Sequence, residues 1–229
     1  MILIIKHKDI EGAGLFGDFF KSKTNYKVKI IELEKKDKFP SLDECKAIIS
    51  LGGPMSVYQE EEYPFLKEEK IFLKEAIKKD IPILGVCLGA QLLASVLKAK
   101  VEKAKNPEIG WYEVNLIASA KKDPLFYNLP KTLKVFQWHE DTFKIPKMGV
   151  LLATANTCKN QAVRFSRYCW GLQFHPEMNL KMLKEWLKVY EGYNLDKEKI
   201  INSFSAIKRI YLKQAETLFD NFLRIIKKR

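Results

Sequence analysis

Residues 81–97 contain the pattern that decides the fold: Ile-Pro-Ile-Leu-Gly-Val-Cys-Leu-Gly-Ala-Gln-Leu-Leu-Ala-Ser-Val-Leu. The first six residues form an apolar run of the length of a buried strand, and residues 91–97 place apolar side chains at helical spacing. A single cysteine, Cys87, stands between them, with Gly85 and Gly89 on either side. The stretch therefore predicts a strand that turns abruptly into a helix, with a cysteine at the turn.

Serine hydrolases use the same arrangement, in which a G-x-S-x-G turn lifts the nucleophile clear of the sheet. Small neighbours are needed because the backbone is crowded and another group must approach closely. The backbone N–H of the following residue, here Leu88, would then face an oxyanion. These residues alone leave two interpretations open. Cys87 is either a nucleophile or a buried structural cysteine, which is a common fate of a free thiol.

Length and composition indicate an ordinary globular protein. The chain has 229 residues, of which 47% are hydrophobic and 30% are charged, and this suits one α/β domain. No apolar run approaches the roughly 20 residues of a membrane span. The first residues also lack the features of a signal peptide. We therefore expect a cytoplasmic protein with no membrane partner.

The metal-ligating residue types are few and far apart. No C-x-x-C pair is present, which argues against a zinc site and against a disulfide framework, and we expect no cofactor. The formal net charge of +12 would suit a nucleic-acid partner. However, the lysines are spread along the chain beside acidic residues, so a nucleic-acid partner is disfavoured. The sequence makes no prediction of the oligomeric state. The cysteines and histidines are Cys45, Cys87, Cys158, Cys169, His7, His139 and His175.

The first hundred residues alternate between strand-like and helix-like segments. This alternation is typical of a parallel sheet that is covered by helices on both faces. The expected strands are residues 1–5, 26–33, 46–51 and 81–86. Helices are expected at residues 64–79 and in the segment that follows Cys87, and residues 11–20 are expected to be a loop that leads into a helix.

The second half of the chain has a different pattern, because helix periodicity is scarce between its strand candidates. We expect these short strands to extend the sheet with antiparallel or mixed pairing; they are residues 111–117, 133–138, 150–154, 161–165 and 170–174. Helices are expected at residues 179–190 and 197–226. The predicted fold is therefore a three-layer α/β domain over residues 1–190 with a mostly parallel central sheet, and residues 191–229 form a helical C-terminal extension of that domain.

A cysteine nucleophile needs a base, and the base needs a group that orients it. His175 follows the expected strand 170–174, Pro176 fixes the local backbone, and Glu177 stands two residues further on. Glu177 could hold the imidazole as the aspartate does in a Ser-His-Asp triad. Taken alone, His175 also fits a histidine in a surface turn, so its role depends on whether it meets Cys87.

An acyl-transfer site also needs donors for the oxyanion. Residues 52–54, Gly-Gly-Pro, lie at the end of the third expected strand, where open parallel sheets bind their ligands. The backbone N–H of Gly53 could point at a substrate oxygen together with that of Leu88. A simple tight turn is the alternative for these residues.

Several motifs resemble those of the class I, or triad, glutamine amidotransferases, and in particular the stand-alone proteins that are similar to the amidotransferase domain of GMP synthase. The resemblance runs from about residue 1 to residue 180, and the order and spacing of the motifs agree. The motifs are Leu-Gly-Gly-Pro-Met-Ser-Val-Tyr (51–58), Gly-Val-Cys-Leu-Gly-Ala-Gln (85–91), Glu-Ile-Gly-Trp (108–111), Gln-Trp-His-Glu-Asp-Thr-Phe (137–143), Leu-Leu-Ala-Thr-Ala-Asn (151–156), Gln-Ala-Val-Arg-Phe (161–165) and Gly-Leu-Gln-Phe-His-Pro-Glu (171–177).

This resemblance implies a flavodoxin-like core and a glutamine-hydrolysing site. Cys87 would attack the γ-carboxamide of glutamine to form a γ-glutamyl thioester, and ammonia would leave with a proton from His175. Further roles follow by position in the motifs. Glu177 would complete the triad, and Gly53 and Leu88 would supply the oxyanion hole. Gln91 would contact the amino-acid end of the substrate, and the backbone near Asn160 and Gln161 would line the glutamine pocket. His139 would have a structural or supporting role.

Three functions are compatible with these features. The chain could be an amidotransferase subunit that delivers ammonia to a separate synthetase. It could instead be a free-standing hydrolase of γ-glutamyl amides or peptides, as some plant relatives of the stand-alone group are. A binding or regulatory protein that kept the fold without activity is the third alternative, and the intact Cys87, His175 and Glu177 argue against it.

Overall fold

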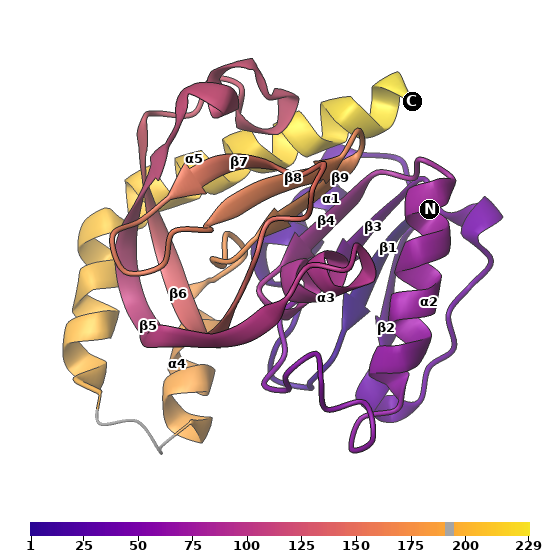
Figure 1. Cartoon of the computed structure of the whole chain (residues 1–229). Coiled ribbons are helices and arrows are strands. Elements are labelled where there is room, and N and C mark those ends of the chain that lie inside the picture. Colours follow the sequence, from indigo (N-terminus) through magenta and orange to yellow (C-terminus); the bar gives the residue numbers. More distant parts are fainter. Residues whose placement is uncertain (191–194) are drawn as a thin grey trace.

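The computed structural model describes residues 1–190 and 195–229, which surround one central sheet (Figure 1). The strand order is β2-β1-β3-β4-β9-β8-β7-β5-β6. The parallel half contains β1 (Ile2–Lys6), β2 (Val28–Glu32), β3 (Ala47–Ser50), β4 (Ile83–Val86) and β9 (Cys169–Leu172). The antiparallel half contains β5 (Val101–Leu116), β6 (Thr132–Phe143), β7 (Val150–Thr154) and β8 (Ala162–Ser166). The predicted α/β fold and its mixed second half are confirmed.

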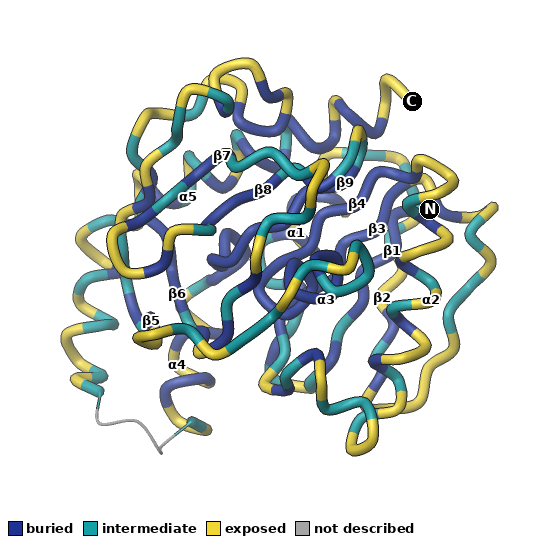
Figure 2. Tube along the Cα trace, viewed as in Figure 1, coloured by how far each residue is buried: buried dark blue, intermediate teal, exposed yellow. Residues whose placement is uncertain are grey.

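Helices cover both faces of the parallel strands, because successive side chains of a strand point to opposite faces. Ile2 and Ile4 of β1 face the core that contains α1 and α5, whereas Leu3 and Ile5 face the core that contains α2 and α3. Figure 2 shows β1, β3, β4 and β9 as the buried centre of the molecule. The helices are α1 (Gly14–Lys23), α2 (Phe65–Lys78), α3 (Leu88–Val96), α4 (Leu180–Val189) and α5 (Lys197–Lys228).

The long C-terminal helix α5 packs against the sheet layer. Phe219 packs on Phe16 of α1 with ring centroids 4.3 Å apart, and the hydroxyl of Tyr211 donates to the backbone oxygen of His175 at 3.0 Å. The expected boundary between residues 190 and 191 adjoins residues 191–194, which lie outside the described residues. None of the described helices is long and apolar enough to cross a membrane.

The two longest strands extend well beyond the expected segments. β5 and β6 have 16 and 12 residues, whereas the sequence suggested short strands at 111–117 and 133–138. The first part of β5 is polar and contains Pro107, and its register with β6 shifts between Lys103 and Glu108. A proline and a register shift interrupt the alternation by which a strand is recognised, so this part was missed.

The turn between β4 and α3 places Cys87 in a backbone conformation that L-residues rarely adopt, with φ 49° and ψ −106°. Such a residue stores about 1–3 kcal/mol of strain. The surroundings hold it there: the backbone N–H of Cys87 donates to Leu172 of β9 at 2.7 Å, and that of Gly89 donates to Leu51 at 3.1 Å. The expected strand–cysteine–helix turn is therefore present and is anchored to both neighbouring strands.

Gly85 and Gly89, on either side of Cys87, leave no room for a side chain. A Cβ atom at Gly85 would lie 2.6 Å from the backbone of Gly89, and one at Gly89 would lie 2.1 Å from the backbone oxygen of Ser50. Both contacts are with backbone, which cannot rotate away. The helix can therefore begin directly against β3 and β4 only if these two positions lack side chains.

We expect Gly89→Ala to destabilise the protein by about 3 kcal/mol, because the added methyl group overpacks the contact with Ser50. Gly12→Ala is the matched control, since nothing lies within 4 Å of a Cβ atom at that position. Denaturant unfolding of both variants measures the difference. Equal midpoints for the two variants would contradict this account of the turn.

Candidate active site

A cavity of about 140 Å³ opens at the carboxyl ends of the parallel strands. Gly53 follows β3, Cys87 follows β4 and His175 follows β9, and these three strands are neighbours in the sheet. All three residues line the cavity. Parallel strands end at the same edge of a sheet, so the fold gathers residues that are far apart in the sequence.

The imidazole of His175 is held by Glu177. The ring nitrogen Nδ1 lies 2.7 Å from Oε1 of Glu177, and both side chains are buried. An ionised carboxylate only accepts hydrogen bonds, so this contact places a proton on Nδ1. The other nitrogen, Nε2, is buried and has no hydrogen-bond partner among the described residues. It is therefore available for a reacting proton.

Cys87 lies beside this imidazole and lines the same cavity. The Cβ atom of Cys87 and the Cε1 atom of His175 are 3.6 and 2.9 Å from the point that a Cβ atom at Gly52 would occupy. The thiol donates to the backbone oxygen of Trp138 at 3.7 Å and accepts from Nε2 of Gln173 at 3.7 Å. The sulfur thus lies among Gly52, Trp138, Gln173 and the imidazole.

The electrostatic surroundings favour a protonated His175. Burial by itself lowers the pKa of an imidazole, but the charge of Glu177, together with the sulfur of Cys87, outweighs burial and raises the pKa of His175 well above its usual value. An imidazolium at this position can give a proton to a leaving group.

Two other expected site residues, Leu88 and Gln91, lie close to Cys87 in α3. Leu88 is the first residue of α3, and the first N–H groups of a helix have no acceptor within the helix. Gln91, one turn later, lines the cavity, and its Nε2 donates to the backbone oxygen of Asp141 at 3.1 Å and to Oε1 of Gln173 at 3.4 Å. Gln91 therefore holds the backbone of Asp141 and the side chain of Gln173 by hydrogen bonds.

Asn160 and Gln161, near which the backbone is expected to line the glutamine pocket, are not among the described residues that line the cavity around Cys87. The side chain of Asn160 donates to the backbone oxygen of Phe143 at 2.7 Å, and Gln161 is fully buried. Residues 138–141 of β6 line the cavity.

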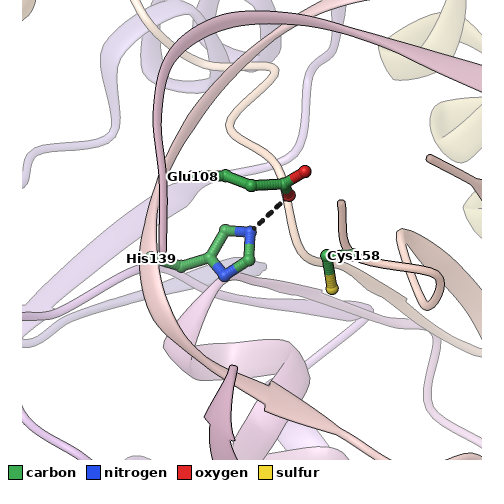
Figure 3. Close-up of side chains that lie close together, drawn as sticks. All are labelled: Glu108, His139 and Cys158. Carbon is green, nitrogen blue, oxygen red and sulfur yellow. Dashed lines mark hydrogen bonds and ion pairs between the residues drawn. The ribbon is translucent and has the colours of Figure 1, made fainter. Parts of the chain in front are cut away.

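His139, which also lines the cavity, belongs to a buried network with Glu108 (Figure 3). Its Nε2 lies 2.9 Å from Oε2 of Glu108, and its Nδ1 lies 3.0 Å from the backbone oxygen of Asp141. Gln161 donates to the same Glu108 oxygen at 2.7 Å. Because the Asp141 carbonyl also accepts from Gln91, the network fixes the backbone that borders the cavity.

Glu108, His139 and Cys158 have the donor types of a metal site, and their ligand atoms lie within 4.8 Å of one another. The hydrogen bonds do not fit a cation. Nδ1 of His139 donates to a carbonyl oxygen, and Nε2 shares a proton with Oε2 of Glu108, so neither ring nitrogen has a free lone pair. The same Glu108 oxygen also accepts from Gln161. Figure 3 shows the hydrogen-bonded pair beside the thiol. This arrangement is that of a buried, hydrogen-bonded His–Glu pair between β5 and β6.

Sequence reasoning missed the residues that complete the cavity. Glu11 is buried and accepts a hydrogen bond from the hydroxyl of Tyr190 at 2.8 Å. Trp138 and Trp186 form an edge-to-face pair with ring centroids 5.9 Å apart. Trp138 lies within one of the family-like motifs, but Glu11, Trp186 and Tyr190 come from a loop and a helix whose relation to the cysteine only the fold reveals.

We expect a thiol reagent such as iodoacetamide to modify Cys87 before the other cysteines at about pH 7, because Cys87 lines the cavity. Burial raises the pKa of the thiols of Cys45, Cys158 and Cys169, which slows their reaction. Peptide mapping by mass spectrometry after brief labelling measures the order. Faster labelling of any other cysteine would contradict this site.

Comparison with known proteins places this geometry in a family. A family model described as glutamine amidotransferase class-I matches residues 21–188. A crystal structure of a glutamine amidotransferase from Thermotoga maritima is 35% identical, covers 96% of both chains and has a TM-score of 0.89.

Curated relatives agree with this assignment over part of their length. A subunit of the glutamine-hydrolysing GMP synthase of Sulfolobus acidocaldarius is 32% identical over 155 residues, which are 66% of this chain and 77% of that protein. A glutamine amidotransferase-like protein of Salmonella typhimurium is 28% identical over 148 residues, which are 63% of this chain and 62% of that protein. Only 24% of the length of several complete GMP synthases is matched. The chain belongs to the class I glutamine amidotransferase family.

Proposed function

We propose that this protein hydrolyses the γ-amide of glutamine through Cys87, His175 and Glu177 and releases ammonia for a separate acceptor or synthetase. The observation that carries the proposal is the free Nε2 of His175. Glu177 holds Nδ1 at 2.7 Å, and Nε2 is buried without a partner among the described residues, in the cavity that also contains the thiol. A buried ring nitrogen left without a partner is costly in a structural histidine but is required in a catalytic one.

The proposed reaction has two halves. The thiol of Cys87 gives its proton to Nε2 of His175 while its sulfur bonds to the carbonyl carbon of the γ-carboxamide of glutamine. The C–N bond then breaks, and the nitrogen takes that proton from His175 and leaves as ammonia. Water then gives a proton to Nε2 of His175 and attacks the thioester carbon, the S–C bond breaks, and glutamate is released. The backbone N–H groups of Gly53 and Leu88 would stabilise the oxyanion in both halves.

The charges around the cavity support an amino-acid substrate. Lys103 lies at the cavity, 3.0 Å from Oε2 of Glu140 and 3.2 Å from Oδ1 of Asp141. A free amino acid carries one carboxylate and one ammonium group, and this cluster offers both complementary signs. The same charges would also bind the α-amino and α-carboxyl groups of a γ-glutamyl peptide. They therefore support recognition of the γ-glutamyl group but do not distinguish ammonia from an amino acid as the leaving group.

The curated relatives favour a separate partner. The Sulfolobus protein is named as one subunit of GMP synthase, a similar Picrophilus torridus protein has the same name, and that name implies a second chain. By analogy, ammonia from this site would serve a synthetase encoded elsewhere.

We expect Cys87→Ala to reduce glutamine hydrolysis at least about a thousandfold, because the residual rate without a nucleophile is small. Glutamine should still bind, since the wall and the charged residues remain. Cys45→Ala, which changes a thiol outside the cavity, should retain wild-type turnover. Glutamate release measures activity, and calorimetry measures binding. Surviving turnover in Cys87→Ala would mean that the nucleophile is wrongly assigned.

A substrate comparison separates an amidotransferase subunit from a γ-glutamyl peptidase. Purified protein is given glutamine or γ-glutamyl dipeptides, with and without cell extract, and glutamate release is followed. The proposal expects glutamine to be the better substrate and its hydrolysis to rise when extract supplies a partner. Rapid cleavage of dipeptides by the protein alone would instead identify a peptidase. No hydrolysis of either substrate, with Cys87 unmodified by a glutamine-derived diazo-ketone, would indicate a binding protein.

A further inference from the structure

A second buried network lies directly behind the Gly52–Gly53 turn, and the reaction proposed above does not use it. His7 follows β1, Ser50 ends β3 and Glu69 lies in α2, and all three are fully buried. Nδ1 of His7 lies 2.9 Å from the backbone oxygen of Gly52, and Nε2 lies 2.6 Å from Oε2 of Glu69. The hydroxyl of Ser50 donates to the other Glu69 oxygen at 2.7 Å.

The chemistry of these contacts fixes where one proton must lie. A carbonyl oxygen only accepts, so Nδ1 of His7 carries a proton and donates it to Gly52. The contact between Nε2 and Glu69 contains a second proton, on either atom. In both cases the His7–Glu69 pair is neutral overall, which suits its complete burial. Without Glu69 a neutral imidazole could place its single proton on Nε2 and lose the bond to Gly52.

The electrostatic surroundings of His7 agree with this arrangement. Burial lowers the pKa of His7, but the charge and hydrogen bond of Glu69 from α2, the Gly52 carbonyl from the loop after β3 and the charge of Glu11 from the loop after β1 together raise it above its usual value. The ring of Phe65 in α2 also faces His7, with centroids 6.3 Å apart.

The hydrogen bond from His7 to the carbonyl of Gly52 also sets the direction of the N–H of Gly53. The carbonyl of Gly52 and the N–H of Gly53 belong to one planar trans peptide and point in opposite directions. A hydrogen bond that fixes the carbonyl therefore also fixes the N–H. Gly53 lines the cavity with Cys87, and two consecutive glycines would otherwise have wide conformational freedom. A donor that is already oriented stabilises an oxyanion without reorganising during the reaction.

We propose that His7, held in its tautomer by Glu69, is a positioning residue that aims the N–H of Gly53 at the oxygen of the reacting amide. This inference rests on the proposed function, in which Gly53 is an oxyanion donor. His7 does not touch the substrate. It acts through the Gly52–Gly53 peptide, so its loss should affect the rate of the chemical step more than substrate binding.

Two matched substitutions test the role of His7. In His7→Asn the side-chain amide nitrogen can take the place of Nδ1 and donate to Gly52, whereas His7→Gln places its amide near Nε2 and cannot. Both remove the ring, so a purely structural role would affect them equally. We expect His7→Gln to reduce kcat for glutamine about a hundredfold with little change in KM, and His7→Asn to recover most of that loss.

Labelling of Cys87 gives a readout that does not require turnover. A glutamine-derived diazo-ketone develops negative charge on its oxygen when Cys87 attacks it, whereas iodoacetamide does not depend on an oxyanion hole. We expect His7→Gln to slow the diazo-ketone labelling and to leave iodoacetamide labelling unchanged. Equal rates for His7→Asn and His7→Gln, or a loss confined to KM, would overturn the positioning role.

Glu69 provides a second pair of variants if the His7 variants do not fold. In Glu69→Gln the amide can donate to Nε2 and keep the proton on Nδ1, so turnover should stay within a few-fold of wild type. Glu69→Met removes this control and should lower kcat. Equal effects of the two would overturn the inference. A wild-type protein that shows neither glutamine turnover nor diazo-ketone labelling would overturn the proposed function itself, and the positioning role with it.

Discussion

The strained turn at Cys87 is the constraint on which the site depends. A residue at φ 49° is retained only where its surroundings hold it. Here the backbone of β9 fixes the N–H of Cys87, and the backbone of Leu51 fixes the N–H of Gly89. The two flanking glycines let the helix approach the neighbouring strands closely. The sulfur therefore stands at a fixed point above the sheet.

The remaining parts of the site are positioned from behind by hydrogen bonds between buried groups. Glu177 orients His175, the Glu108–His139 pair fixes the carbonyl of Asp141, and the His7–Glu69 pair binds the carbonyl of Gly52. Each pair combines an imidazole with a carboxylate, so its charges compensate where water is absent. Each of the three histidines of the chain is thus hydrogen-bonded to a carboxylate, and two of them, His139 and His175, line the cavity.

Some features of the sequence could be interpreted without coordinates because they are local. The apolar run before Cys87 and the helical spacing after it predicted β4 and α3, and the alternation of segments predicted the parallel half of the sheet. The length of β5 could not be predicted, since Pro107 and a register shift interrupt its pattern. The role of the backbone near Asn160 and Gln161 in the glutamine pocket stays a prediction, because it rests on motif position alone.

The sequence by itself determined the fold class, the family and the three side chains to be tested as a triad, because glycine spacing and short motifs are properties of neighbouring residues. Only the tertiary structure decided which other residues meet there. Glu11, Trp186 and Tyr190 reach the cavity, and His7 reaches Glu69, across 62 positions of the chain. Such contacts arise from the order of strands in the sheet and from helix packing, and neither leaves a pattern in the adjacent residues.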